Sequence, residues 1–271
     1  MLETIDFSEI KLIISDLDGT LLNDNKELSA DFFEIEEALF NKGIVFAVAS
    51  GRQFYNMKNL FAPIAHRLLF IAENGTYVSQ HNELIHLETI PMNRCIPLIQ
   101  KARSLQNAYT IVCAKNAAYI ESREEVFVQE VNKYYAKVEI VEDLTLIQDE
   151  VLKVTICDFT DPNTNAFPHF KEDMADLNVV VSGIIWLDIS IIGANKGKAI
   201  RKVQQNWNIS ENQTMVFGDY LNDLEMMQVA DFSFAMKNAH PKILETAKYQ
   251  TSLTNAEHGV SHILRKIAFA E

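Results

Sequence analysis

Short runs of apolar residues recur in the first and last thirds of the chain, separated by stretches whose apolar residues follow helical spacing. Such runs are typical of strands buried on both faces of a parallel sheet; they cover 12–15, 44–49, 68–72, 214–217 and 232–234. The intervening spacing predicts helices over about 32–40, up to about 61, over 196–207, from 222 and from 260. We expect Ser29 to cap the first helix and Gly43 to end it. The alternation predicts an α/β fold with a doubly wound parallel sheet.

The middle of the chain follows a different pattern. After a hairpin over 77–78 and 84–87, it predicts helices over 91–105, 124–135 and 167–177, and short strands over 109–113, 118–121, 152–157, 179–181 and 186–191. Short strands joined by short links, with helices among them, are typical of an α+β layer. We therefore expect a discontinuous core over 1–90 and 190–271, and an inserted α+β domain over 91–189.

Composition narrows the class of partners. The chain has 37 acidic and 24 basic residues, a formal charge of −13, which argues against nucleic acid or an anionic membrane as a partner. An anionic substrate would need positive charge supplied locally. Three widely spaced cysteines (Cys95, Cys113 and Cys157) fit a reducing compartment, and no basic segment followed by an apolar stretch opens the chain. We expect a cytoplasmic protein without an obligate protein partner.

Two predicted strands end in acidic clusters. Asp16 and Asp18 follow the first strand, whereas Asp219 and Asp223 follow the strand over 214–217. The carboxyl ends of parallel strands open onto one edge, so these carboxylates are expected to converge there. Carboxylates that lie this close repel one another unless a cation separates them, and Mg²⁺ is the cation this donor set favours. A solvated Asp-Gly turn and a helix N-cap are the structural alternatives.

Two further features belong to the same edge. Lys196 begins the helix that returns the chain to the core, so its ammonium can reach the acidic clusters. Ser50 and Gly51 follow the second strand and offer a hydroxyl and a backbone amide, which are donors suited to a phosphoryl oxygen. Exposed lysines and Ser-Gly turns are common, and each is weak evidence alone. Together they predict a site with a nucleophile, an acid/base, oxyanion donors and metal ligands.

In order and spacing, these motifs resemble the four signature motifs of the haloacid dehalogenase-like (HAD) phosphohydrolase superfamily, and the insert is similar to the cap of its Cof-type subfamily. The motifs are Asp16-x-Asp18-Gly19-Thr20, Ser50-Gly51-Arg52, Lys196 and Gly218-Asp219-x-x-Asn222-Asp223, with supporting matches at 73–76 and 236–241. Ser50 replaces the more frequent threonine but keeps the hydroxyl. The segment 192–194 lacks the proline often found before the lysine, which affects the expected geometry of the cap hinge.

The resemblance implies a Rossmann-like core and a Mg²⁺-dependent phosphatase. Asp16 would attack phosphorus to form an aspartyl-phosphate, and Asp18 would protonate the leaving group and later take a proton from water. It also implies that Mg²⁺ is held by the Asp16 side chain, the Asp18 carbonyl and Asp219. Asp223 would lie at or just behind the metal, orienting Lys196 or a metal-bound water.

The resemblance also implies a set of contacts to the phosphate or the rest of a small phosphomonoester. These are the Leu17 amide, Ser50, Gly51, Asn74, Lys196 and Asn222. Arg52 is expected to contact the substrate or the cap, with a surface ion pair as the alternative. The cap would select among substrates, such as sugar phosphates, without supplying chemistry.

Three other functions remain open at this point. A phosphomutase would share the acidic edge but return the phosphoryl group to a sugar. A phosphoacceptor signalling module also uses an aspartate, Mg²⁺, a hydroxyl and a lysine, although it needs neither Asp18 nor a large insert. A catalytically silent sugar-phosphate binder would have no evident reason to retain Asp16 and Asp18 together.

Overall fold

The computed structural model describes residues 6–269, and the chain gathers into two compact units. The first unit comprises residues up to 51, 61–86 and those from 195 onward, and the second comprises 52–60 and 87–194. The sequence placed the boundaries at 90/91 and 189/190. It did not predict that residues 52–60 would group with the inserted segment.

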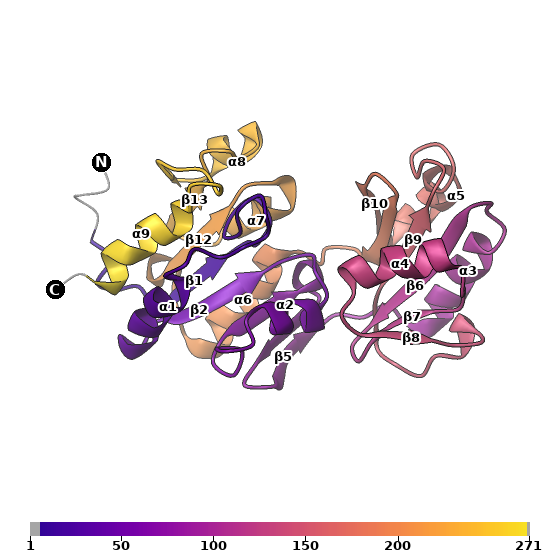
Figure 1. Cartoon of the computed structure of the whole chain (residues 1–271), viewed down its shortest axis with the longest axis horizontal. Helices are drawn as coiled ribbons and strands as arrows, with labels where there is room; N and C mark the ends of the chain where they lie inside the picture. Colours follow the sequence, from indigo (N-terminus) through magenta and orange to yellow (C-terminus); the bar gives the residue numbers. More distant parts are fainter. Residues whose placement is uncertain (1–5, 270–271) are drawn as a thin grey trace. The chain divides into compact units, whose positions relative to one another are not determined.

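The first unit is built on an eight-stranded sheet with the order β14-β13-β12-β1-β2-β3-β4-β5 (Figure 1). The strands from β14 to β3 pair in parallel, and β4 is antiparallel to β3. Every residue of β1, β3 and β12 is buried, as the uniformly apolar runs predict. The strands are β1 (Leu12–Ser15), β2 (Val45–Ala49), β3 (Leu69–Ala72), β4 (Tyr77–Gln80), β5 (Glu83–Leu87), β12 (Thr214–Gly218), β13 (Phe232–Ala235) and β14 (Tyr249–Gln250).

Helices cover both faces of this sheet, which confirms the doubly wound α/β class. Helix α1 packs against α9, and α6 packs against α7 (Figure 1). The steps from β1 to β2 and from β12 to β13 run in opposite directions along the sheet, so right-handed crossovers place α1 and α7 on opposite faces. The helices of this unit are α1 (Phe32–Asn41), α6 (Lys196–Trp207), α7 (Leu224–Met227), α8 (Pro241–Thr246) and α9 (Gly259–Ala268).

Strand register aligns the segments that carry the acidic motifs. Ser15, the last residue of β1, pairs with Phe217 of β12 and with Val48 of β2. The Asp16 amide donates to the Phe217 carbonyl at 2.9 Å. The chain therefore leaves β1 and β12 at the same level of one sheet edge, which is where open α/β sheets bind ligands.

The second unit contains a six-stranded sheet with the order β10-β11-β9-β6-β7-β8. All its neighbouring strands are antiparallel except β7 and β8. Apolar clusters on its two faces include residues of α3 and of α4, respectively. Its elements are α2 (Phe54–Leu60), α3 (Met92–Ala102), β6 (Ala108–Ala114), β7 (Ala118–Ile120), α4 (Glu125–Tyr134), β8 (Val138–Ile140), β9 (Val151–Asp158), α5 (Phe167–Phe170), β10 (Leu177–Gly183) and β11 (Trp186–Ile191).

Side-chain contacts explain why residues 52–60 group with the second unit. The Gln53 amide nitrogen donates to the Lys137 carbonyl at 3.0 Å, and its oxygen accepts from the amides of Ala136 and Lys137. The Lys137 ammonium also lies 4.9 Å from the centre of the Tyr55 ring. These bonds connect α2 to the segment that precedes β8.

Some local expectations were wrong. The helix expected over 167–177 is the short α5 followed by a 3₁₀ turn, and β10 already begins at Leu177. A 3₁₀ turn over Leu221–Asp223 precedes α7. Ser29 does not cap α1, because its hydroxyl pairs with that of Ser261 at 2.7 Å and Asp31 occupies the N-cap position. Gly43 does end α1, with φ +76°.

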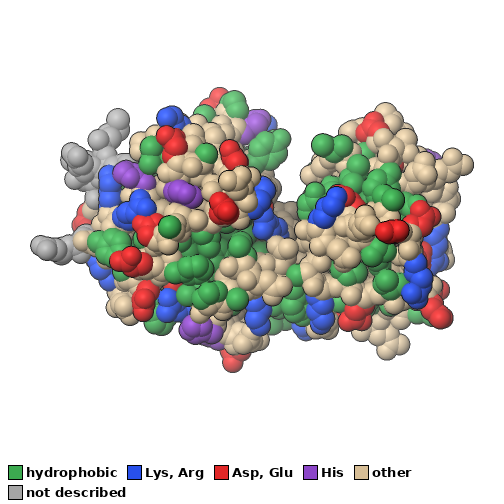
Figure 2. All heavy atoms as spheres, viewed as in Figure 1, with side chains coloured by type: hydrophobic (Ala, Val, Ile, Leu, Met, Phe, Trp, Pro, Cys, Tyr) green, Lys and Arg blue, Asp and Glu red, His purple; other side chains and the backbone are tan. Residues whose placement is uncertain are grey.

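The acidic excess is not gathered into one field on the face shown in Figure 2, where acidic and basic side chains are interspersed. On this face, the charged groups close to a site therefore determine whether an ionic ligand is attracted or repelled there. Within residues 6–269, no helix combines the length and apolar character needed to span a bilayer.

Candidate active site

The loop after β1 is held directly against Asp219. Gly19 has φ +80°, and a side chain there would clash with the Asp219 carboxylate. The Thr20 hydroxyl donates to Asp219 Oδ1 at 2.8 Å. The glycine therefore allows both the left-handed turn and the close approach of the two loops.

A buried lysine lies at the centre of the site. The Lys196 side chain is fully buried, and its ammonium lies 2.5 Å from Asp16 Oδ1 and 2.6 Å from Asp223 Oδ1. Asn195 caps α6 by accepting from the Lys198 amide, which fixes the helix end that carries Lys196. One ammonium thus neutralises part of the charge of two carboxylates from different loops.

Asp223 also organises the loop after β12. Its Oδ2 accepts from the amides of Asp219 and Tyr220 at 2.9 and 3.2 Å. Any side chain at Gly218 would place its Cβ 2.6 Å from the same oxygen. Asp223 therefore holds this turn from its C-terminal side.

Burial dominates the electrostatics of these groups. Burial raises the pKa of Asp16 above its usual value, and nearby Asp223 and Asp219 add to the shift while Lys196 opposes it. Burial likewise raises the pKa of Asp219 to about 6, against the hydrogen bond from Thr20. Burial alone would lower the pKa of Lys196, but Asp16 and Asp223 outweigh it and raise that pKa.

The donor set fits a divalent cation. Asp16, Asp219 and Asp223 each offer a carboxylate oxygen within 4.8 Å of the others, and hard oxygen ligands of this kind suit Mg²⁺. Both Asp223 oxygens already accept hydrogen bonds from Lys196 or from backbone amides. Asp16 and Asp219 are therefore the carboxylates best suited to direct ligation.

The predicted phosphate-binding residues of the first unit also meet. Asn74 has φ +54°. Its Oδ1 accepts from the Asn222 side-chain Nδ2 at 3.1 Å, and its backbone amide donates to the Ser50 carbonyl at 3.0 Å. A Cβ at Gly51 would lie 3.1 Å from the side-chain Nδ2 of Asn74. Asn74 thus links the segment after β2 to the segment after β12.

Comparison with known proteins identifies the family. Residues 13–264 match the model of the haloacid dehalogenase-like hydrolases. The chain belongs to this family. A 5-amino-6-(5-phospho-D-ribitylamino)uracil phosphatase of Escherichia coli, YbjI, is 31% identical over 95% of this chain and 96% of its own. A solved haloacid dehalogenase-like hydrolase from Bacteroides thetaiotaomicron is 26% identical, covers 95% of this chain and 99% of its own, and has a TM-score of 0.84.

A second solved relative agrees. TM0651 from Thermotoga maritima is 27% identical, with a TM-score of 0.84 over 95% of this chain and 97% of its own. These matches confirm that the chain resembles Cof-type HAD hydrolases. The chain is a phosphatase of this family.

The remaining predicted residues of this HAD phosphatase are placed less directly. Asp18 is outside the three-carboxylate group, which consists of Asp16, Asp219 and Asp223. Its Oδ1 accepts from the Lys26 ammonium at 2.8 Å. The Leu17 side chain is buried and its carbonyl accepts from the Leu22 amide at 2.9 Å. Arg52 belongs to the second unit, where Nη1 lies 3.4 Å from Asn56 Oδ1. Its role as a substrate contact stays a prediction.

Three residues at the site were not assigned a role from the sequence. Thr20 orients Asp219, and Asn238 and Asn255 bond to the loop after β1. Thr20 and Asn238 do lie in the quoted motifs, which was the available signal. No local pattern points to Asn255, because its partner Leu22 is 233 residues away along the chain.

Proposed function

We propose that this HAD phosphatase hydrolyses small phosphomonoesters with Mg²⁺ through an aspartyl-phosphate on Asp16. The observation that carries the proposal is the position of the Asp16 carboxylate. It lies 2.5 Å from the buried Lys196 ammonium, and it belongs to the same cluster of carboxylates as Asp219. A nucleophilic carboxylate next to an ammonium and metal ligands is suited to attack a phosphate dianion, whose charge would otherwise repel it.

The reaction has two steps. Asp16 attacks phosphorus, the bond from phosphorus to the ester oxygen breaks, and Asp18 gives its proton to the departing alkoxide. Asp18, now a carboxylate, then takes a proton from a water that attacks the aspartyl-phosphate. Inorganic phosphate leaves and both aspartates return to their starting states.

The other groups hold the phosphate and its counter-charge. Asp16, Asp219 and the Asp18 carbonyl would hold Mg²⁺, which would neutralise charge between the nucleophile and the phosphate. Lys196 and Asn222, together with Ser50, Gly51 and the Leu17 amide, stabilise the phosphoryl oxygens, and Asp223 orients Lys196. Asn74 positions Asn222 and the Ser50 segment.

The names of two relatives suggest the first substrate to test. YbjI and the Bacillus subtilis protein YcsE, 27% identical over 95% of this chain, are both named 5-amino-6-(5-phospho-D-ribitylamino)uracil phosphatases. A third relative, 24% identical, is named an HMP-PP phosphatase. We propose that the substrate is a small phosphorylated metabolite similar to those in these names. We propose that the second unit selects it.

Phosphate release from a panel of sugar phosphates, nucleotide-related phosphates and an aryl phosphate tests the proposal. We expect turnover with Mg²⁺, none after chelation with EDTA, and none in Asp16→Asn. Unchanged turnover after thorough chelation contradicts the metal assignment. Substitutions in the second unit should change kcat/KM for metabolites but leave a small aryl phosphate nearly unaffected, and uniform loss would contradict the selective role.

The same assays separate the alternatives. A phosphomutase would require a bisphosphorylated activator and would return an isomerised sugar phosphate. A phosphoacceptor module would yield a phosphoprotein that persists for many minutes, and a silent binder would bind substrate without releasing phosphate.

A further inference from the structure

One short segment after β13 contacts the loops that follow both β1 and β12. The Met236 amide donates to the Gly218 carbonyl at 3.0 Å, and the His240 amide donates to the Asp219 carbonyl at 2.8 Å. Between them, Asn238 Nδ2 donates to the Gly19 carbonyl at 2.8 Å. Residues 236–240 therefore bond to both of the loops that carry the acidic motifs.

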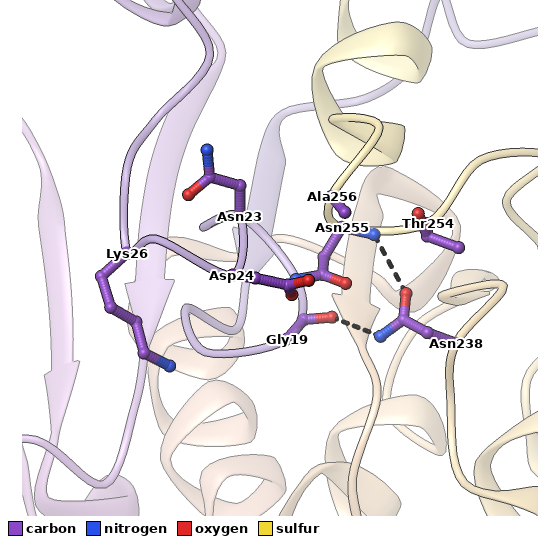
Figure 3. A pocket seen from close by; sticks show the side chains of 8 residues that line it. All are labelled: Gly19, Asn23, Asp24, Lys26, Asn238, Thr254, Asn255 and Ala256. Carbon is purple, nitrogen blue, oxygen red and sulfur yellow. Dashed lines mark hydrogen bonds between the residues drawn. The ribbon is translucent and has the colours of Figure 1, made fainter.

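Asn255 fixes Asn238 in turn. Its backbone amide donates to Asn238 Oδ1 at 3.0 Å, so both ends of the Asn238 amide group are engaged and its orientation is set (Figure 3). The nearly buried Asn255 side chain donates to the Leu22 carbonyl at 3.1 Å and to Asp24 Oδ1 at 3.0 Å. The loop after β1 is thus held at Gly19, Leu22 and Asp24.

The buried side chains of Leu17, Leu21 and Leu22 anchor one side of this loop, whereas the side that faces Asn238 is polar. Figure 3 shows Gly19, Asn238 and Asn255 around a cavity of about 500 Å³ whose other side chains are mainly polar, among them Asn23, Lys26 and Thr254. A close-packed apolar core fixes backbone by shape, whereas a polar hollow does not. On this side the hydrogen bonds must fix the loop.

We propose that Asn238, supported by Asn255, is a positioning residue that sets the distance between the Asp16–Thr20 loop and Asp219. The Gly19 carbonyl shares its peptide plane with the Thr20 amide, and the Thr20 hydroxyl orients Asp219. Release of that carbonyl frees the residue that aligns a metal-binding carboxylate. The catalytic consequence rests on the proposed function, but the effect on metal binding does not require turnover.

Two variants test the role. Asn238→Ala removes both hydrogen bonds. Asn238→Asp keeps the acceptor for Asn255 but places a carboxylate oxygen against the Gly19 carbonyl. The added negative charge would by itself tighten Mg²⁺ binding, so weaker binding in Asn238→Asp reports lost geometry. Asn41→Ala is the control, because Asn41 is exposed at the end of α1, near the sheet edge opposite the site.

Mg²⁺ binding is measured by titration calorimetry, and kcat and KM are measured at saturating Mg²⁺. We expect the Mg²⁺ dissociation constant to rise about tenfold or more in both Asn238 variants, which is the usual effect of losing support behind a ligand. We also expect kcat to fall while KM stays within about twofold of the parent. Asn41→Ala should match the parent in all three quantities.

Other results would overturn the role. If the Asn238 variants only melt at lower temperature and bind Mg²⁺ as the parent does, Asn238 is structural. If the parent binds no Mg²⁺, there is no metal site to position. If the parent binds Mg²⁺ but hydrolyses no phosphomonoester, while the variants bind Mg²⁺ more weakly, the positioning role stands and the proposed function fails.

Discussion

The Lys196 ammonium determines which single substitutions at the site are informative. It is fully buried between Asp16 and Asp223. Removal of one partner of a buried ion pair costs about 3–5 kcal/mol when it leaves a charge uncompensated. Replacement of Lys196 would leave two buried carboxylates facing one another, whereas replacement of Asp16 leaves Lys196 with Asp223. Asp16 is therefore the better position for separating catalysis from stability.

Asp16→Asn should lower kcat by at least about a thousandfold, since the amide cannot act as the nucleophile. We expect the metal-free variant to melt no lower than the metal-free parent. The midpoint of the variant should exceed that of the parent by more at pH 8 than at pH 5. Burial raises the folded-state pKa of Asp16, so its contribution to stability is full below about pH 4 and is lost as pH rises through the folded pKa. The variant escapes this loss.

Thermal melts of both proteins in EDTA at pH 5 and pH 8 check this expectation. Asp219, whose pKa is raised to about 6, loses its own contribution between about pH 4 and pH 6 in the parent, so the comparison at pH 8 is the more direct report on Asp16. A clearly lower midpoint for Asp16→Asn at pH 8 would contradict the placement of Asp16 among buried, repelling carboxylates.

Asp18→Asn should affect leaving groups unequally. The Asp18 side chain is partly exposed, pairs with Lys26 and lies outside the group formed by Asp16, Asp219 and Asp223, so its proposed task is proton transfer and not attack on phosphorus. General acid catalysis contributes about 10²–10⁴-fold, so loss should be largest for sugar phosphates. An aryl phosphate should still form the aspartyl-phosphate, which then hydrolyses slowly and gives a pre-steady-state burst. Equal losses without a burst would argue against the acid/base role.

At the scale of loops and elements, two glycines form a matched pair. Gly19 and Gly43 have φ of +80° and +76°, but only Gly19 faces another group, Asp219, whereas a Cβ at Gly43 has nothing within 4 Å. Gly43→Ala should cost about 1–2 kcal/mol of backbone strain and leave kcat unchanged. Gly19→Ala should cause the same backbone strain and also displace the Asp219 carboxylate. It should therefore weaken Mg²⁺ binding and reduce kcat strongly. Similar kinetics for the two variants would show that Gly19 serves only the turn.

The central parallel strands of the first sheet were predictable because they are apolar runs that are almost entirely buried; they are β1, β2, β3, β12 and β13. The elements that were missed are short or polar. β14 has two residues, α8 has six, and β8 is mostly exposed. Such segments carry too few residues for a period to emerge, and their pairing partners select their conformation. The helix up to about 61 was expected, but its grouping with the second unit depends on Gln53 contacts to residues more than 80 positions away.

The acidic edge was predictable because strand order and carboxylate type together point to one place in an α/β sheet. The finer arrangement depends on tertiary contacts. Thr20 meets Asp219 across 199 positions of sequence, and Asn238 meets Gly19 across 219. A threonine or an asparagine has many structural uses, so neither residue type nor spacing could assign these partners.

At the scale of the whole molecule, the two units have separate sheets and separate cores. The second unit buries its own apolar clusters around α3 and α4. All three carboxylates of the metal group belong to the first unit. A ligand stabilises only the cooperative unit whose folded state binds it, so Mg²⁺ should act on the two units unequally.

Hydrogen exchange followed by mass spectrometry, with and without Mg²⁺, measures this asymmetry. At a Mg²⁺ concentration of about 100 times the dissociation constant, binding stabilises the folded state by about 2.7 kcal/mol. Globally exchanging amides of β1, β12 and α6 should therefore slow by about a hundredfold, while those of β6, β9 and β11 keep their rates. Asp219→Asn should abolish the effect in the first unit without changing the second. Equal slowing in both units would show that they unfold as one cooperative structure, since the metal could then stabilise the second sheet only through the first.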